Sequence, residues 1–269
     1  MQNVSATYRR IFADPLHWFE TSVVIGESGR LLDQLGNVLL FGGDAILVDI
    51  GGPDGGFTDS QLIEVETSHS LFEGTPSVGN CYSGEIDVTM LAPIAEIPRM
   101  ARIQLFTRVA NAAEHSEWLP KGVYFIDTRD TTQNNDDLDI LSFHGYDAMM
   151  RAEADYPSDT GSYPKTDIQV VRIIAQAMQV GVDSRTVAIM TRGYRIELPS
   201  DYSMREVLSY IGAMYGGNWI INDVGDLRLI PLTSIPSETS YLTDSVGQVI
   251  TFGKDFEHPN EEVRILVNR

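Results

Sequence analysis

The sequence predicts a mainly β protein with α+β parts, and three patterns indicate this class. Short runs that alternate between apolar and polar residues dominate the first 128 residues. The pattern turns helical from Gly145 to about Pro199. A capped helix and a hairpin then occupy residues 203–231. Strands spaced this closely are typical of an antiparallel barrel or sandwich rather than of a βαβ sheet.

The predicted strands of the first part are short and are bounded by turn residues. In the run 83–90, Ile86, Val88 and Met90 share one face, as alternate residues of a half-buried strand do. The glycine-rich run 51–56 predicts a loop, because glycine and proline interrupt regular structure. The predicted strands are residues 22–26, 38–41, 45–50, 61–67, 83–90, 102–109, 122–129 and 138–144.

Two helices are predicted in the middle of the chain. The first covers residues 146–155 and ends before Pro157, because proline cannot continue a helix. The second begins at a cap on Thr166 or Asp167 and ends at Gly181. Its apolar residues recur at helical spacing and would form one buried stripe, namely Ile168, Val171, Ile174, Ala175 and Met178.

Residues 203–231 carry the most complete set of local signals. Ser203 can cap a helix, and Glu206, three residues later, can bond back to it. Gly216 and Gly217 then end the helix, since glycine adopts the left-handed conformation that a C-terminal cap requires. The apolar helix face would be Val207, Leu208, Ile211 and Met214 or Tyr215. Two strands, 218–222 and 226–230, would form a hairpin around the loop 223–225.

Three further stretches have a strand-like composition. They are residues 186–198, 249–252 and 262–268. The last of them ends almost at Arg269, so pairing within a sheet would fix the C-terminal end of the chain.

The charge balance excludes some function classes. The chain has 38 acidic and 19 basic residues and a formal net charge of -19. Such a surface repels phosphate backbones and anionic bilayers, so specific nucleic-acid binding is not expected. The N-terminus lacks the layout of a secretory signal, and no apolar run approaches the ~20 residues of a membrane helix, so no membrane insertion is expected. We expect the chain to be made in a cytoplasm.

No motif predicts catalysis, a cofactor or a metal centre. The five histidines are scattered, without HExxH spacing. A nucleophile elbow, Walker glycines and a GxGxxG fingerprint are also missing from the sequence. Cys81, the single cysteine, cannot form an intrachain disulfide, and a buried inert thiol is the expected state. We therefore assign no catalytic, cofactor-binding or metal residue and predict that the protein is not an enzyme.

Two acidic loops and four large aromatic residues were considered as binding elements. One loop contains Asp49, Asp54 and Asp59; the other contains Asp130, Asn134, Asn135, Asp136, Asp137 and Asp139. Neither has the spacing of a calcium loop, so solvated turns are favoured over structural calcium at Asp136 or Asp139. Core or interface positions are expected for Trp18, Phe19, Trp118 and Trp219.

Three stretches resemble phage tail baseplate hub proteins, including the hub of contractile tails, its siphophage tail-tip counterparts and the type VI secretion spike. The first is 65–90, in which a strand leads through "SLFEG" and "PSVGN" into an alternating strand. The second is 121–155, with "GVYFID", a polar loop, a strand and "GYDAM". The third is the helix, "GGN" and hairpin of 203–231.

This resemblance implies two tube-like antiparallel β-barrel domains with a small inserted α/β domain. The implied domains are 1–128, the first barrel; 129–199, the insertion; and 200–269, the second barrel. Strand 85–90 and hairpin 218–229 would lie in the barrels. Three subunits would present six such domains and so join a six-fold tail tube to a three-fold spike or fibre. Since many siphophage relatives continue further, a chain that stops at Arg269 would be a minimal hub.

The resemblance implies a trimeric structural protein of the virion tail, assembled in the host bacterial cytoplasm. Implied partners are the other two subunits, a tail tube or distal tail protein, and a spike, fibre or tape-measure protein. An acidic wall would suit a channel that carries DNA. Two alternatives remain: a peptidoglycan-degrading tail-tip enzyme and a monomeric receptor- or carbohydrate-binding module.

Overall fold

The computed structural model describes 4–26, 29–30, 40–41, 44–45, 47–48, 53–72, 77–91, 97, 100–133, 139–157 and 161–232. The chain divides into two compact units, and the described residues all belong to the first, Met1–Leu232. The second unit, Thr233–Arg269, lies outside them, as do the strands predicted at 249–252 and 262–268.

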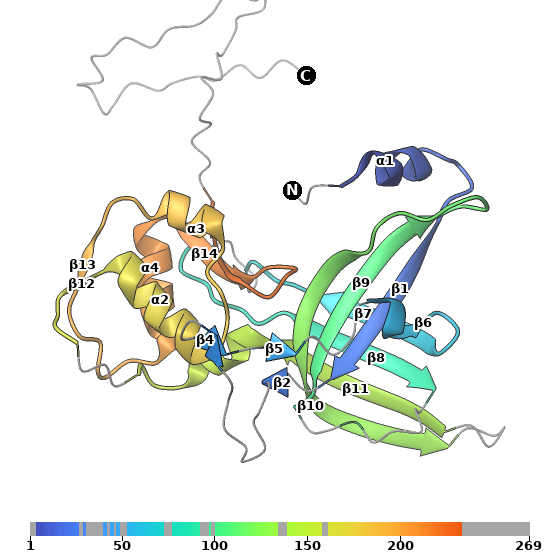
Figure 1. Cartoon of the computed structure of the whole chain (residues 1–269). Helices are drawn as coiled ribbons and strands as arrows, with labels where there is room; N and C mark the ends of the chain where they lie inside the picture. Colours follow the sequence, from blue (N-terminus) through green and yellow to red (C-terminus); the bar gives the residue numbers. More distant parts are fainter. Residues whose placement is uncertain are drawn as a thin grey trace, which may run out of the picture. The chain divides into compact units, whose positions relative to one another are not determined.

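The largest element of the fold is a seven-stranded antiparallel sheet (Figure 1). Each strand of this sheet is antiparallel to the strands beside it. The strands in that order are β6 (Phe57–Thr58), β1 (Trp18–Gly26), β9 (Arg102–Ala110), β10 (Leu119–Gln133), β11 (Asp139–Asp147), β8 (Glu85–Leu91) and β7 (Leu62–Ser68). The prediction of a mainly β protein with antiparallel strands is thereby confirmed.

The sheet curls into a half-barrel because its two outermost strands are consecutive in sequence. β6 and β7 are separated by residues 59–61 alone. In a flat sheet the outer strands would lie roughly 29 Å apart, at about 4.8 Å per strand. Four residue steps reach at most about 14 Å. The sheet must therefore bend until its edges approach each other, and a turn from Thr58 O to Gln61 N, 2.7 Å, makes the connection.

Alternation along the strands gives this half-barrel its core. Ile86, Val88 and Met90 of β8 are buried, as predicted. Strand β10 lines this core and shifts its register at Gly122. Gly122 has a φ of +155 and lies against the ring of Tyr124, so a Cβ at this position would have no room. The buried cluster consists of Val23, Ile86, Val88, Met90, Ile97, Ala101, Ile103, Leu105, Tyr124, Ile126, Leu141 and Phe143.

The other elements that the structure describes are short helices and short paired strands. Before the sheet lies α1 (Ala6–Phe12), and η1 (Pro53–Gly55) precedes β6. Two short pairs join β2 (Gly29–Arg30) with β5 (Leu47–Val48) and β3 (Leu40–Phe41) with β4 (Asp44–Ala45). After the sheet follow η2 (Ala148–Glu153), β12 (Lys165–Thr166), α2 (Asp167–Met178), α3 (Ser184–Ile189), β13 (Arg195–Ile196), α4 (Met204–Met214), β14 (Gly217–Ile221) and β15 (Leu227–Pro231).

The predicted unit at 203–231 is confirmed in detail. The capping box is present: Ser203 N donates to Glu206 Oε2 at 2.7 Å, and Glu206 N donates to Ser203 Oγ at 3.2 Å. Gly216 ends α4 with φ +61, and the hairpin strands lie within one residue of the predicted ones. Trp219 is buried and donates its Nε1–H to Leu208 O at 2.7 Å. Within the described residues, no helix is long and apolar enough to cross a bilayer.

Two predictions of local structure were wrong, each because an aspartate caps a helix. The helix predicted at 146–155 is the 3₁₀-helix η2, since Asp147 ends β11 and accepts from Met149 N at 2.8 Å. The strand-like stretch 186–198 begins inside α3, because Asp183 accepts from Arg185 N at 2.8 Å. In addition, α2 starts after Thr166 as predicted but ends at Gln179, in the left-handed conformation, before Gly181.

A second core lies among the elements that follow β11. It includes the predicted apolar residues of α2 and α4, with Ile168 and Tyr215 only partly buried. Phe125 of β10 and Cys81 also belong to it, so the sheet contributes to this core. The division of the chain at residues 128 and 199 stays a prediction.

Candidate interaction surface

The sheet has two free edges that face each other across a seam. β1 pairs with β6 at Ser22 and Val23, and no described strand pairs with its residues 18–21 on that side. Among the strands that the structure describes, β7, at the other end of the strand order, pairs with β8 alone. A hollow of 420 Å³ lies between them, lined by Thr21, Thr107, Val65, Thr67 and others. Free edges of this kind leave backbone N–H and C=O groups available to another chain.

One of these backbone groups is already engaged. Thr21 N donates to Asp59 Oδ1 at 3.2 Å, so the turn at 59–61 protects the edge of β1 at that point.

An exposed aromatic patch lies where β1 begins. We define it as Tyr8, Phe12, Leu16, His17 and Phe19. Leu16 is 80% exposed, Phe19 53% and Phe12 52%. The ring of Phe12 lies 5.0 Å from that of His17 and 6.3 Å from that of Phe19, centroid to centroid. An apolar group of this size on a surface is typical of a protein contact.

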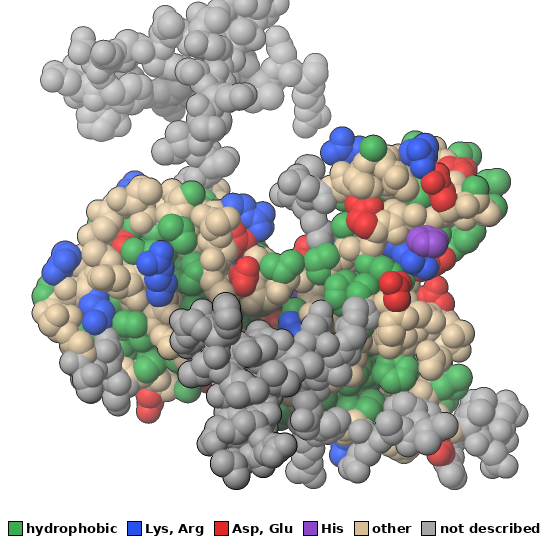
Figure 2. All heavy atoms as spheres, viewed as in Figure 1, with side chains coloured by type: hydrophobic (Ala, Val, Ile, Leu, Met, Phe, Trp, Pro, Cys, Tyr) green, Lys and Arg blue, Asp and Glu red, His purple; other side chains and the backbone are tan. Residues whose placement is uncertain are grey.

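The aromatic patch is held in place by polar contacts of α1 with the turn after β9. Arg10 forms a bidentate ion pair with Glu114, with N–O distances of 2.6 and 2.8 Å. Ser5 Oγ donates to Glu117 at 2.5 Å, and Ile11 of α1 is fully buried. These contacts fix the position of α1 and therefore of the Tyr8 and Phe12 rings that it carries. Figure 2 shows basic, acidic and hydrophobic side chains beside one another around α1.

The four aromatic residues predicted as core or interface anchors divide into three kinds: buried, exposed and half-buried. Trp219 is a core residue, 1% exposed. Trp18 and Phe19 are exposed at the start of β1, on opposite faces of the strand. Trp118 is half-buried, with the guanidinium of Arg108 4.3 Å from its ring centroid and its Nε1–H donating to Asp54 Oδ1.

The outer face of β7 and β8 is acidic. We define the acidic face as Glu64, Glu66, Glu85 and Asp87. Glu66 lies directly opposite Asp87, and Glu85 opposite Ser68, so the four carboxylates share the face that points away from the core. β7 and β8 contain no lysine or arginine, and Ile63, 55% exposed, is next to Glu64.

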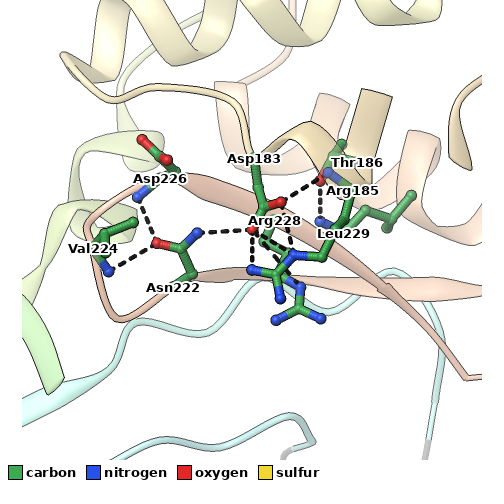
Figure 3. A network of polar contacts seen from close by, with 8 residues as sticks. All are labelled: Asp183, Arg185, Thr186, Asn222, Val224, Asp226, Arg228 and Leu229. Carbon is green, nitrogen blue, oxygen red and sulfur yellow. Dashed lines mark hydrogen bonds and ion pairs between the residues drawn. The ribbon is translucent and has the colours of Figure 1, made fainter. Parts of the chain in front are cut away.

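A cavity of 440 Å³ lies beside the hairpin β14–β15. Two of its lining side chains, Arg185 and Arg228, face the same carboxylate (Figure 3). Arg185 Nε lies 2.9 Å from Asp183 Oδ1, and Arg228 Nε lies 4.0 Å from Asp183 Oδ2. Asn222 Nδ2 donates to the same oxygen at 2.9 Å. The side-chain hydrogen bond from Arg185 is the main cause that holds the pKa of Asp183 well below its usual range.

Titratable groups in and near the cavity are engaged in hydrogen bonds within the fold. Asp147 accepts from Gly84 N at 2.7 Å and from Met149 N at 2.8 Å. Burial raises the pKa of Asp147 to about 7, against the effect of these two bonds. Tyr124 Oη lies 3.0 Å from His69 Nε2, and burial raises the pKa of that tyrosine. A carboxylate that already binds two backbone N–H groups is poorly placed to act as a base.

The other candidate sites of the sequence do not come together. Over the part of the chain that the structure describes, no three His, Cys, Asp or Glu side chains are grouped so that they could hold a metal. Asp49, Asn134, Asn135, Asp136 and Asp137 lie outside that part. Cys81 is buried, as predicted, and burial raises the pKa of its thiol to about 12, so it is unreactive.

Sequence reasoning missed the aromatic patch and the acidic face. The available signal for α1 was a possible cap at Ser5, whose Oγ accepts from Tyr8 N at 3.0 Å. For the acidic face it was the i, i+2 spacing of Glu64 and Glu66 within an alternating strand.

No family model and no curated protein matches this chain. It is similar to the 43 kDa tail protein of prophage MuSo2 from Shewanella oneidensis, at 13% identity over 80% of this chain and 56% of that one, with a TM-score of 0.44. It is also similar to the tail protein from Neisseria meningitidis MC58, at 10% identity over 78% of this chain and 50% of that one, with a TM-score of 0.45. A third similar structure is the half-lidded Francisella PdpA-VgrG complex, at 10% identity over 83% and 33%, with a TM-score of 0.40.

The chain thus spans about half the length of the two tail proteins that it matches.

Proposed function

We propose that this chain is a structural component of a phage or phage-like tail and that it acts as a trimeric hub. In that role it joins the six-fold tail tube to a three-fold spike or fibre. The observation that supports the proposal best is the open seam of the curled sheet with the aromatic patch beside its free strand. A half-barrel with free edges and exposed rings suits a subunit that is completed by neighbours.

The mechanism of such a hub is geometric. Each copy supplies a curled sheet whose inner face is packed and whose edges are free, and neighbouring copies close a ring around a channel. The proposed domains are 1–128, 129–199 and 200–269, as the sequence resemblance implies. The proposed partners are two further copies, a tail tube or distal tail protein, and a spike, fibre or tape-measure protein, in the virion tail.

The proposed channel carries DNA past a negatively charged wall. A net charge of -19 keeps phosphate backbones from adhering, so DNA would pass without being held. We propose no cofactor, metal or catalytic residue for this role. A structure of the assembled ring in which the acidic side chains lie mainly on the outer rim would contradict the idea of an acidic channel.

A receptor- or carbohydrate-binding module is the second candidate, and the exposed rings of Phe12, Trp18 and Phe19 are the observation that favours it. Aromatic side chains at a surface can stack on sugars as well as bind protein. A binding module of this kind requires no self-association, whereas the proposed hub does.

Light scattering across a concentration series distinguishes the two. The hub predicts a stable species near three times the 29.8 kDa of one chain. A strict monomer at high concentration that binds a cell-wall oligosaccharide saturably would favour the binding module and contradict the trimeric hub.

A further inference from the structure

The hairpin β14–β15 has apolar side chains on both of its faces. One face packs in the second core and is formed by Trp219, Ile221, Leu227 and Leu229. The other face carries Ile220, Arg228 and Ile230, since Ile220 lies opposite Arg228 and alternate residues of a strand share a face. Strands that meet water on one face normally have polar side chains there. The two isoleucines are only half-buried, which indicates a surface that another group covers.

The cavity of 440 Å³ lies against this second face. Its lining includes Ile220, Arg228 and Ile230 from the hairpin, and Leu71 and Tyr82 from the segments that follow β7 and precede β8. Pockets that bind small ligands usually have volumes of about 300–1,000 Å³. In size and in its aliphatic lining residues, the cavity therefore suits an apolar group of a ligand.

Arg228 brings hydrogen-bond donors to the cavity that the described residues leave unused. Among those residues its guanidinium has one polar contact, an ion pair in which Nε lies 4.0 Å from Asp183 Oδ2 (Figure 3). This distance is too long for a hydrogen bond. The Arg228 side chain is 28% exposed, so a ligand can reach part of the guanidinium. Because a guanidinium has five N–H donors, an oxygen acceptor in the cavity would gain a hydrogen bond.

The charges around the cavity favour an uncharged ligand. Its lining includes two arginines, Arg185 and Arg228, and two acidic residues, Asp147 and Asp223. Asp183 adds a third carboxyl group, because it contacts both arginines. Since two arginines face three carboxyl groups, the site has no excess of positive charge with which to attract an anion. A carbonyl oxygen accepts a hydrogen bond without adding charge.

We propose that this cavity binds one apolar residue of a peptide segment from another protein. The apolar side chain of that segment contacts Ile220 and Ile230, and a backbone carbonyl oxygen accepts a hydrogen bond from the guanidinium of Arg228. A peptide is favoured over a sugar because the two isoleucines offer no hydrogen bonds to hydroxyl groups. The inference goes beyond the proposed hub, since it requires neither three-fold symmetry nor self-association.

Nuclear magnetic resonance of the isoleucine methyl groups tests this site. The probe is N-acetyl-leucinamide, which has an aliphatic side chain and carbonyl groups but no charge. We expect it to shift the methyl signals of Ile220 and Ile230 saturably, with a Kd of a few millimolar, as is usual for a ligand of its size. N-acetyl-leucine, which has a carboxylate in place of the amide, should bind more weakly, and so should N-acetylglucosamine.

Arg228→Met separates the donor from the apolar surface, because methionine keeps an aliphatic side chain but has no N–H group. We expect the variant to bind N-acetyl-leucinamide about five-fold more weakly. Arg172→Met, at an exposed arginine of α2 that does not line the cavity, is the matched control and should leave the affinity unchanged. The comparison of the three probes on the wild type tests the site even if Arg228→Met does not fold.

Four outcomes would overturn the inference. The first is the absence of saturable shifts at concentrations of the amide well above the expected Kd. The second is equal affinity in the wild type and in Arg228→Met. Tighter binding of N-acetyl-leucine or of N-acetylglucosamine than of the amide, the third, would assign the cavity to an anion or to a sugar. The fourth is a change in the Ile220 and Ile230 signals on dilution of the protein but not with the amide, which would assign the cavity to a second copy.

Failure of this inference and failure of the proposed function are distinguishable. The hub depends on the trimer that light scattering measures, and the cavity depends on the methyl shifts. A stable trimer that does not bind the amide would leave the hub standing and remove the peptide site. A strict monomer that binds the amide through Arg228 would contradict the hub and support the peptide site.

Discussion

The curled sheet and the hairpin β14–β15 differ in how far the backbone groups at their edges are paired. Both edges of the hairpin are paired: Trp219 N donates to Asn80 O at 2.8 Å, and Leu227 N donates to Gly181 O at 2.9 Å. In the sheet, no described strand pairs with residues 18–21 of β1 on one side or with the outer side of β7. The hairpin is thus complete within one copy, whereas the sheet has pairing capacity to spare.

The two regions also differ in whether their carboxylates have cationic partners. Asp183, beside the hairpin, is surrounded by Arg185, Arg228 and Asn222. Glu66, on the sheet, faces another carboxylate and forms no ion pair within the described residues. A satisfied charge stabilises one copy, while an unsatisfied exposed charge is available to a second copy. We therefore expect the hairpin region to contribute mainly to stability, and we propose the sheet as the region that contacts other copies.

The largest expected effect is on the stability of the hairpin region. Trp219→Ala should lower the free energy of unfolding by about 3–5 kcal/mol, because it leaves a cavity and removes the hydrogen bond to Leu208 O. Urea denaturation measures this. Trp18→Ala, at a side chain that is 46% exposed, is the control and should cost less than about 1 kcal/mol. Equal losses in the two variants would end the distinction between the regions.

The next effect concerns assembly. Phe12→Ser should weaken self-association by about 10- to 30-fold while leaving the melting temperature nearly unchanged, because the ring is half exposed within one copy. Sedimentation velocity at several concentrations measures the association. Val224→Ser, on an equally exposed side chain in the hairpin turn, is the control and should not change association. A large drop in melting temperature for Phe12→Ser would instead place this ring in the fold of one copy.

A smaller effect should appear as pH dependence. The pKa of Asp147 is about 7 in the folded chain and 3.8 ordinarily, so the folded state binds more protons between these values. The stability from this carboxyl is complete below 3.8 and is lost as the pH rises through 7. Relative to Asp147→Asn, the wild type should lose about 1.4 kcal/mol between roughly pH 6 and pH 8. Parallel pH profiles of the two proteins would show that the carboxyl is already ionised at the lower pH.

The smallest effect is local. Ser203→Ala should cost about 1 kcal/mol, because it removes the N-terminal cap of α4. Ser209→Ala, inside the same helix, is the control and should change stability by less than about 0.5 kcal/mol. Thermal denaturation of both variants checks this, and a cost at Ser209 that matches the cost at Ser203 would contradict the role of the cap.

Local signals predicted part of this structure well. The unit at 203–231 was correct within one residue because capping, glycine stops and hairpin turns act over a few neighbours. The helix α3 was missed, since one aspartate cap at Asp183 decides it against a strand-like composition. Strand β11 likewise continues to Asp147, although a helix was predicted to begin at Tyr146.

The candidate interaction surface depends on contacts far apart in sequence. The seam exists because β6 and β7 lie at opposite ends of the strand order, which follows from pairings such as that of β11 with β8. The exposure of Phe12 depends on where α1 docks, and Glu114 and Glu117 set that position from more than a hundred residues away. Alternation predicts which face of a strand is buried, but it does not say which edges remain free.

The central claim is that the free edges of the sheet are completed by other copies of the chain. Electron microscopy of the purified protein, at a concentration where light scattering reports its largest stable species, tests it most directly. Particles with three-fold symmetry around a central opening are expected. Compact particles of one chain, or two-fold particles without an opening, would contradict it.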